Sequence, residues 1–324
     1  MKKLLAVLVV LTIAASMAFA GGNQAQTQQK SLITVGFAQC KADESDWRMA
    51  NTRSMMEAFN HPDYRLIIAD SNNDAAKQIS DVQGFINQGV DYIIIAAVNE
   101  AGWDTVLRNA QQAGIPVILM DRTVTAPENL WAVWVGANFR KEGDMAMEWI
   151  AKRFGNNPVN IVHLQGQLGA SAQVGRTEAL NAAVAGHANW TLLGQQTGDW
   201  GTDTAKTIMT SWIRQHGNNI NAVFAENDNM ALGAIQALRE AGIAVGGTNG
   251  VAIATVDANR WSVQMTLEGA INVNVECNPL LGPAAFQTIE NLRQGRTVAK
   301  RTTVEPQAFY FDTLTAEIVR NRPY

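Results

Sequence analysis

The sequence predicts an α/β protein with two domains, each built on a doubly wound parallel sheet. Short apolar runs without polar alternation occur at 32–38, 64–69, 92–97 and 115–120. Such runs are typical of strands buried on both faces of a parallel sheet. Helix-like stretches separate them, and this alternation covers both sheet faces with helices through right-handed crossovers. The pattern then repeats, and roughly 290 residues are long for a single core.

The stretch 74–89 shows why helices are expected between the strands. Its apolar residues recur at helical spacing from Ile79 to Ile86, which is typical of a helix with one face on a core. Gly89 follows the last turn, and Gly114 occupies the same place before the fourth strand. Both positions are typical of helix ends that lead directly into a strand.

The second run is expected to hold further strands at 159–164, 189–194, 221–225 and 251–256. A helix over 228–242 closes at Gly242, and the two runs join near 131–143. In doubly wound sheets, ligands bind outside the carboxyl ends of the strands. The residues that follow each strand are therefore the first candidates for a site.

Asp121 and Arg122 follow the apolar run "VILM" directly, where turn residues would be usual. Taken alone, the pair is equally well explained as an ion pair that seals a strand end. Other strand ends, however, are also followed by carboxylates, guanidiniums, amides, a hydroxyl or indoles. These further candidates are Gln39, Glu44, Trp47, Arg48, Trp103, Ser171, Arg176, Trp200, Asn227, Asp257 and Glu276.

This set of side chains suits a sugar. Asp, Asn and Arg present planar, two-pronged groups to neighbouring hydroxyls, and tryptophan packs on the less polar face of a sugar ring. Single members of the set could have structural roles instead. Asp199 and Asp228 could be helix N-caps, and Trp103 and Trp200 could be packing residues.

An exported hydrolase is the alternative interpretation of the same acidic groups. Asp121, Asp257 and Glu276 could supply a glycosidase pair. We expect Arg122 and Arg176 to keep these carboxylates ionised, which leaves no obvious proton donor.

Further catalytic and metal motifs are absent from the sequence. It contains no G-x-S-x-G elbow, and His61, His163, His187 and His216 lack the spacing of metal ligands. We expect His163 to lie in the core. The segment 166–171, "GQLGAS", lacks the Lys-Ser/Thr of a phosphate loop, and its amides are expected to meet ligand hydroxyls. No catalytic residue, metal or cofactor is predicted.

The net charge bears on the class of partner, and the two cysteines raise the separate question of a disulfide. The net charge of −4 and the pI of about 5.6 argue against nucleic acid, because neutralising phosphates needs a basic face. Cys40 and Cys277 could form a disulfide in an oxidising compartment or remain buried thiols. Both alternatives stay open, with free thiols favoured.

The first residues are predicted to be a signal peptide over 1–20. Lys2 and Lys3 precede an apolar stretch, and the segment closes with Ala18-Phe19-Ala20, an A-x-A cleavage pattern. The apolar stretch is too short for a membrane-spanning helix. Cleavage is expected after Ala20, followed by a flexible leader over 21–30 and export to the periplasm.

Several segments together resemble the periplasmic sugar-binding proteins of ABC importers, in the ribose/galactose cluster related in fold to the effector domain of the lac repressor. The resemblance covers nearly all of the chain after the leader. The segments are "VGFAQCKADESDWRMAN", "VILMDRTV", "VHLQGQLGASAQVGR", "FAENDNMALGAIQAL", "ATVDANR" and "VNVECNPLLGPAAF". The "DR" and "END" elements are its most specific parts. The "SDWR" element and Trp103 are most similar to the galactofuranose binders of the cluster.

The resemblance implies which residues contact a sugar. Trp47 and Trp200 would flank the ring. The residues expected to bind its hydroxyls are Arg48, Asp121, Arg122, Arg176, Asn227, Asp257 and Glu276. Cys277 stands where the family is expected to have an apolar hinge residue.

The resemblance also implies how the chain is divided. It implies a type I periplasmic binding protein fold, with a hinge of three crossovers near 136–138, 276–278 and 303–306. The N-terminal lobe would then comprise 31–136 plus 277–304, and the C-terminal lobe 137–276 plus 305–324.

The function expected from this resemblance is capture of a monosaccharide. Galactofuranose or a related furanose, pentose or hexose would bind between the lobes and be delivered to an ABC permease. The protein is expected to be a monomer and not an enzyme, and a second partner, a membrane chemoreceptor, stays open.

Overall fold

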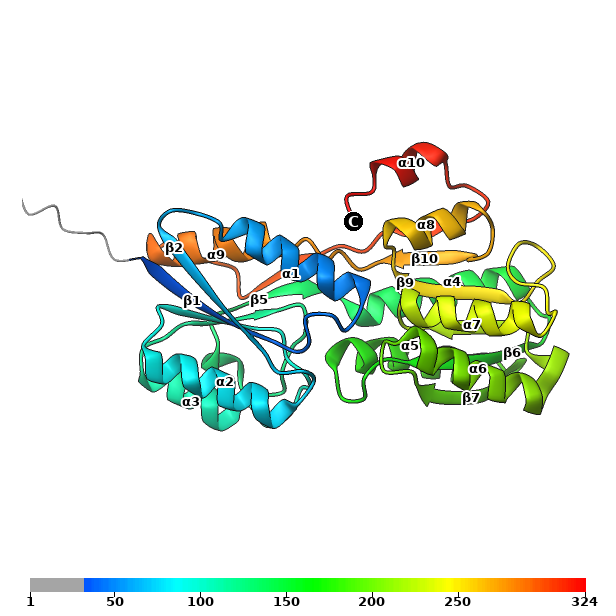
Figure 1. Cartoon of the computed structure of the whole chain (residues 1–324). Coiled ribbons are helices and arrows are strands. Elements are labelled where there is room, and N and C mark those ends of the chain that lie inside the picture. Colours follow the sequence, from blue (N-terminus) through cyan, green and yellow to red (C-terminus); the bar gives the residue numbers. More distant parts are fainter. Residues whose placement is uncertain (1–31) are drawn as a thin grey trace, which may run out of the picture. The chain divides into compact units, whose positions relative to one another are not determined.

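Residues 32–324, which this computed structural model describes, are arranged around two six-stranded sheets (Figure 1). We call each sheet with its helices a lobe. The predicted signal peptide and leader, 1–20 and 21–30, lie outside the described residues. No helix within residues 32–324 combines the length and apolar content that a membrane crossing requires.

The sheet of the first lobe is entirely parallel, with strand order β11-β5-β4-β3-β1-β2. Its strands are β1 Ile33–Gln39, β2 Tyr64–Asp70, β3 Tyr92–Ile95, β4 Val117–Met120, β5 Val133–Ala137 and β11 Arg301–Val304. The central strands β4 and β5 are fully buried. Their apolar composition follows from helix layers on both faces of the sheet.

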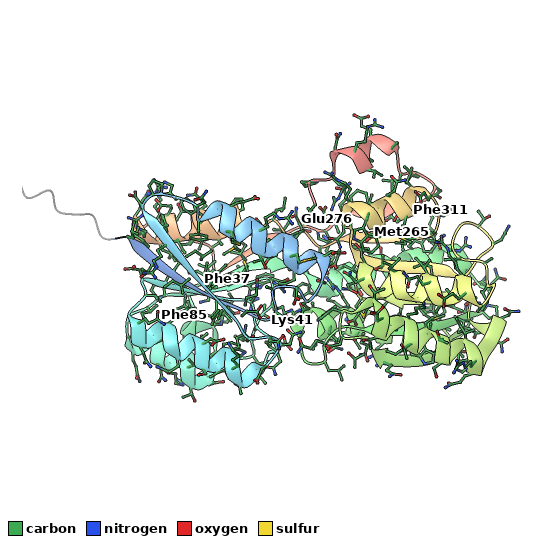
Figure 2. The ribbon with its side chains drawn as sticks, viewed as in Figure 1. Phe37, Lys41, Phe85, Met265, Glu276 and Phe311 are labelled. Carbon is green, nitrogen blue, oxygen red and sulfur yellow. The ribbon has the colours of Figure 1, made fainter. Side chains whose placement is uncertain are left out.

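Two helices cover each face of this sheet (Figure 1). On one face lie α1 Asp46–Ala58 and α9 Gly282–Arg293, and on the other α2 Ala75–Gln88 and α3 Asp104–Gln112. Phe37 and Phe85, labelled in Figure 2, belong to the separate apolar clusters on these two faces. A short 3-10 helix, η1 Glu128–Leu130, precedes β5.

The sheet of the second lobe has the order β12-β10-β9-β8-β6-β7 and is parallel except for β12. Its strands are β6 Val159–Gln165, β7 Trp190–Thr197, β8 Ala222–Ala225, β9 Ala252–Asp257, β10 Val273–Glu276 and β12 Ala308–Tyr310. The helices are α4 Phe139–Phe154, α5 Ser171–Gly186, α6 Thr202–His216, α7 Asp228–Glu240, α8 Arg260–Leu267 and α10 Ala316–Asn321, with the 3-10 helix η2 Gly217–Asn219. Helix α4 packs on α5, and α6 packs on α7.

The predicted fold class, two doubly wound sheets in a three-crossover protein, is confirmed. The chain passes from the first lobe to the second at Asn138, after β5. The helix that follows, α4, packs against β9 and β10 of the second sheet. It returns through 277–281, between β10 and α9, and crosses again through 305–307, between β11 and β12. Each lobe is therefore built from segments that are separated in the sequence.

Some strand predictions were wrong. The run 64–69 was expected to be buried on both faces, but β2 is an edge strand and is partly exposed. Strand β5 lies inside 131–143, where only a connection was expected. Strand β11, "RTTV", is largely exposed, so it carries no apolar pattern to reveal it.

Helix starts also differ from the expected caps. Asn227, and not Asp228, caps α7, because its Oδ1 accepts a hydrogen bond from the Met230 amide at 2.9 Å. Helix α6 begins after Gly201 without a side-chain cap, so Asp199 has no capping role. Ser45 caps α1 by accepting from the Arg48 amide at 3.2 Å. This cap fixes the first turn of α1, which carries two of the predicted site residues.

Close packing of α6 on α7 depends on Gly233. A Cβ at this position would lie 2.2 Å from the Thr202 carbonyl oxygen and 2.8 Å from the Lys206 nitrogen. We therefore expect Gly233→Ala to destabilise the protein by about 1–3 kcal/mol, because backbone atoms of α6 must move. The midpoint of urea unfolding measures this change.

Gly84→Ala is the matched control, because Gly84 also lies inside a helix but a Cβ there would meet no atom within 4 Å. It should stabilise the protein by up to about 1 kcal/mol, since alanine is the better helix former. Equal effects of the two substitutions would show that the α6–α7 contact does not require a glycine.

Candidate functional site

A cavity lies between the two lobes, at the carboxyl ends of their strands. About 290 Å³ of space between its lining side chains is not filled by atoms, including solvent at its opening. It is lined by side chains from both lobes and from the second passage of the chain between the lobes, 277–281. They are Glu44, Ser45, Trp47, Arg48, Asp121, Arg122, Ala172, Arg176, Trp200, Asn227, Asp257 and Cys277.

The wall from the first lobe is a lattice of ion pairs. Arg48 Nη2 lies 2.5 Å from Asp121 Oδ2, and Arg122 Nη2 lies 2.6 Å from Glu44 Oε2. Two longer contacts cross between the pairs, Arg48 to Glu44 at 3.8 Å and Arg122 to Asp121 at 3.9 Å. The four side chains are almost completely buried. Each charge therefore has an opposite charge beside it in a poorly solvated place, as buried ions require.

The backbone at the strand ends is strained where it presents these groups. Asp121 after β4 has φ 62°, Asp257 at the end of β9 has φ 108°, and Trp200 after β7 has φ 65°. Residues other than glycine occupy this region at a cost of about 1–3 kcal/mol each, and such strain is concentrated at functional sites. At Asp121 the conformation is held by two hydrogen bonds, from its own amide to the Val135 carbonyl and from the Trp134 indole to its own carbonyl.

Arg176 is the cation of the second lobe. Its Nε and Nη2 donate to Oε2 of Glu142 at 2.9 and 2.7 Å, and its Nη1 donates to the Glu226 carbonyl at 2.6 Å. Asp257 Oδ1 lies 3.9 Å from Nη2. Glu142 is fully buried in α4 and does not line the cavity. Arg176 therefore reaches the cavity from a firmly held position.

Two indoles complete the wall. Trp47 donates from Nε1 to the Cys277 carbonyl at 2.6 Å, and the Arg48 guanidinium lies 4.6 Å from its ring centre. The Arg122 guanidinium lies 5.5 Å from the ring centre of Trp200. A Cβ on Gly166 would fall 2.0 Å from the Trp200 ring, so only glycine lets the indole approach that strand end. The cavity thus combines flat apolar surfaces with charged hydrogen-bonding groups.

Burial and neighbouring charges act on the ionisable groups in different ways. Burial raises the pKa of Asp257 well above its usual value and also raises the pKa of Glu142, although Arg176 acts in the opposite direction on both. Burial therefore outweighs the neighbouring arginine at Asp257, whose pKa lies above its usual value in spite of Arg176. Burial alone would lower the pKa of Arg122, but the Glu44 carboxylate offsets it, so that pKa is raised.

Most predicted site residues meet at this cavity. Those that line it are Glu44, Trp47, Arg48, Asp121, Arg122, Arg176, Trp200, Asn227 and Asp257. Asn227 also donates to the Trp200 carbonyl at 3.2 Å and so links two strand ends.

Four predicted residues do not line the cavity. Trp103 is buried in the first-lobe core and donates from its indole to the Asn99 carbonyl, so it is a packing residue of α3. Gln39 is fully buried and accepts from the Thr52 hydroxyl at 2.8 Å. Ser171 accepts from the Thr123 amide at 2.9 Å, across the two lobes.

Glu276, labelled in Figure 2 at the end of β10, is the fourth. Its Oε1 accepts from Arg322 Nη1 at 2.9 Å and from the Tyr324 hydroxyl at 2.8 Å. Arg322 also donates to the Ala258 carbonyl at 2.8 Å. Glu276 therefore ties the second passage to the last residues of the chain.

Hydrogen bonds inside the second lobe decide two further expectations. The amides of Gly166 and Gly169 donate to the side chains of Glu226 and Gln173, so the expectation that they meet ligand hydroxyls is wrong. His163 is a buried core residue, as expected, with its Nε2 3.0 Å from Glu226 Oε1.

Polar contacts join the lobes on either side of the cavity. Asp46 Oδ2 accepts from the Trp261 indole at 2.9 Å and from the Asn229 amide group at 3.2 Å. On another side, the Glu100 amide donates to the Gly169 carbonyl at 2.9 Å. Asp46 and Asn229 lie in segments that carry the family resemblance, but nothing in the sequence indicates that they meet each other and Trp261 across the lobes.

Other site features were missed for similar reasons. Ser45, Ala172 and Cys277 line the cavity but have no charge or ring that marks them as ligand contacts. Glu142 follows β5, a strand that was not predicted, so the strand-end argument passes over it. Among residues 32–324, no group of three or more His, Cys, Asp or Glu side chains is arranged to hold a metal ion.

Comparison with known proteins agrees with this architecture. Residues 35–297 match the model of a family described as the periplasmic binding protein domain. The chain belongs to this family of periplasmic binding proteins, and the resemblance seen in its sequence motifs is confirmed.

Several relatives are similar over most of the chain. The galactofuranose-binding protein of Escherichia coli (strain K12) is 33% identical over 99% of this chain and 98% of its own. A structure from Mycobacterium smegmatis in complex with β-D-fucofuranose is 38% identical, with a TM-score of 0.81 over 86% of this chain and 92% of that one. The binding protein of the arabinose ABC transporter from Shewanella sp. ANA-3, bound to L-arabinofuranose, is 34% identical, with a TM-score of 0.83 over 89% and 95%.

The two cysteines are free and buried, which decides between the alternatives left open by the sequence. Burial raises the pKa of the Cys40 thiol, and burial followed by the charge of Glu142 raises that of Cys277 well above its usual value. Each unit of pKa lowers the reactive thiolate fraction about tenfold at neutral pH.

We therefore expect both thiols to react with a disulfide reagent such as DTNB far more slowly in the native protein than in urea. Absorbance of the released thiolate measures both rates, and the Cys40→Ser and Cys277→Ser variants assign them. Labelling of native Cys40 at the rate of a free thiol would contradict its burial.

Proposed function

We propose that this protein binds one neutral monosaccharide in the cavity between its lobes and delivers it to the permease of an ABC importer. The observation that carries the proposal is the combination of paired charges and indoles around the cavity between the lobes. The three guanidiniums at the cavity, Arg48, Arg122 and Arg176, each have a carboxylate partner. A cavity balanced in this way favours an uncharged ligand with many hydroxyls.

The polar groups have the chemistry that a sugar ring requires. Each hydroxyl donates one hydrogen bond and accepts others, so carboxylate oxygens and guanidinium N–H groups can serve neighbouring hydroxyls. The indoles of Trp47 and Trp200 offer flat surfaces to the C–H face of the ring. Gln39, Ser171 and Glu276 would act behind these groups.

A five-membered ring is the proposed form of the sugar. Relatives that cover most of the chain are described as binding galactofuranose, fucofuranose and arabinofuranose. Galactofuranose is therefore the first candidate, with other furanoses close behind.

Capture is proposed to occur by closure of the lobes about their three passages. The moving units would be 31–136 plus 277–304 and 137–276 plus 305–324. Contacts such as Asp46 with Trp261 would form as the lobes meet.

The protein is proposed to act without catalysis, as a monomer exported by a signal peptide over 1–20. Relatives identified by comparison are solute-binding proteins, and they do not support the hydrolase alternative. A chemoreceptor would be a second partner of the sugar-bound form.

A thermal-shift panel of galactose, arabinose, ribose, xylose and glucose tests the proposal. Binding should raise Tm with the logarithm of sugar concentration. Carbon-13 spectra of labelled galactose in the complex then identify the ring form from its anomeric carbon. A panel without any shift, confirmed by calorimetry, would reject monosaccharide binding.

Asp121→Asn should weaken binding of the sugar found in this way by about 1.5–3 kcal/mol, or about 10- to 100-fold in Kd. The substitution keeps the shape of the side chain but removes the charge that pairs with Arg48. Asp104→Asn, at a side chain 57% exposed in α3, is the control and should leave Kd unchanged. Calorimetry on both variants measures the difference, and equal affinities would remove Asp121 from the site.

Affinity should fall as the solution becomes acidic, because of Asp257. In the free protein, burial raises the pKa of this carboxyl well above 3.8, so it takes up a proton at a higher pH than an exposed aspartate does. A sugar hydroxyl that donates to the carboxylate favours the charged form, so binding lowers the pKa and releases a proton. Affinity is then greatest above the pKa of the free protein and is lost as pH falls through it.

Calorimetry in two buffers of different ionisation enthalpy measures this proton release. Asp257→Asn should bind more weakly and lose the release. Proton uptake by the wild-type protein would show that Asp257 instead donates to the sugar.

A further inference from the structure

We propose that Glu142, a residue outside the cavity, positions Arg176 and neutralises it, and thereby makes the cavity select neutral sugars over sugar acids. This inference rests on the proposed function and adds a residue to it. Glu142 does not line the cavity, so its role is exercised through Arg176.

The hydrogen bonds leave Arg176 little freedom. Each of its three nitrogens donates one hydrogen bond to a protein oxygen, two of them to the same Glu142 oxygen. A guanidinium has five N–H groups. Among the contacts within residues 32–324, two N–H groups of Arg176 therefore remain available to a ligand, in a plane that Glu142 and the Glu226 carbonyl fix.

The surroundings of this ion pair are rigid. A Cβ on Gly143, next to Glu142, would lie 2.6 Å from the Ala179 Cβ, and one on Gly175, next to Arg176, would lie 2.9 Å from the nitrogen of residue 140. Helices α4 and α5 thus touch through glycines on both sides of the pair. The pair cannot be widened without separating the helices, and water cannot take its place.

Packing alone does not account for a carboxylate at this position. Glu142 is 0% exposed, and a buried carboxylate is costly unless it is paired. An apolar side chain would fill the same space without that cost. The charge is explained by the cation it serves, Arg176, which lines the cavity.

The charge also affects which ligands can bind. In the first lobe, Arg48 and Arg122 are already paired with carboxylates of their own. If Glu142 lost its charge, Arg176 would lose its close carboxylate partner and keep Asp257, 3.9 Å away, as its remaining one. The negative charge around the cavity would also fall by one. A ligand carboxylate could then pair with the Arg176 guanidinium. A neutral sugar would lose a hydrogen-bond donor that is held in a fixed position.

The test compares Glu142→Gln with the wild-type protein and with Glu148→Gln, an exposed position on the same helix. Calorimetry gives Kd for D-galactose, L-arabinose and D-galacturonate. Glu142→Gln should weaken binding of the neutral sugars about 10- to 100-fold. It should also lower the ratio of the galacturonate Kd to the galactose Kd at least about tenfold. Glu148→Gln should change neither.

Glu142→Asp is the second variant, because it restores the charge with a shorter side chain. It should recover the wild-type preference for neutral sugars, in contrast to the glutamine variant. A purely structural role predicts lower Tm in both variants with an unchanged Kd ratio, and that result would overturn the inference. Failure of the wild-type protein to bind any of these sugars would count against the proposed function itself, whereas wild-type binding with an unaltered glutamine variant would count against Glu142 alone.

Discussion

Buried guanidinium groups need carboxylate partners, and this requirement organises the whole cavity. Arg48 and Asp121 join the first turn of α1 to the end of β4, while Arg176 and Glu142 join α5 to α4. Leaving one partner of such a pair alone is strongly unfavourable in a poorly solvated place. The pairs therefore fix elements that are distant in the sequence before any ligand arrives. The cavity is preorganised because its charges cannot be satisfied in any looser arrangement.

The strained strand ends are a second consequence of the same requirement. Asp121 and Asp257 adopt positive φ values that side chains normally avoid. Hydrogen bonds to neighbouring strands and the adjacent cations offset this cost. A regular turn at residue 121 would direct its carboxylate elsewhere and leave Arg48 without its closest partner. The polar wall and the unusual backbone therefore depend on each other.

The sequence predicts those features of the fold and the cavity that follow from burial or from sheet topology. Strands such as β4 are buried on both faces, and their continuous apolar runs predict them correctly. The exposed strand β11 carries no such pattern and was not visible. For the site, the strand-end rule found Asp121 and Arg176 because parallel strands end at one edge. It did not place Trp103, whose indole is buried in the core, and it passed over Glu142, because the preceding strand β5 was not predicted.

The polar contacts that join the lobes beside the cavity bear on the proposed closure, and through it on how tightly a ligand would be held. Asp46, Asn229 and Trp261 lie outside the cavity lining, and water can satisfy the same groups when the lobes are apart. With the proposed closure of the lobes, these contacts would tune the fraction of empty molecules that are already closed. The apparent dissociation constant is the intrinsic one divided by the competent fraction. Substitutions at this rim can thus shift affinity for every sugar by one common factor, leaving the order of preference among sugars to the cavity wall.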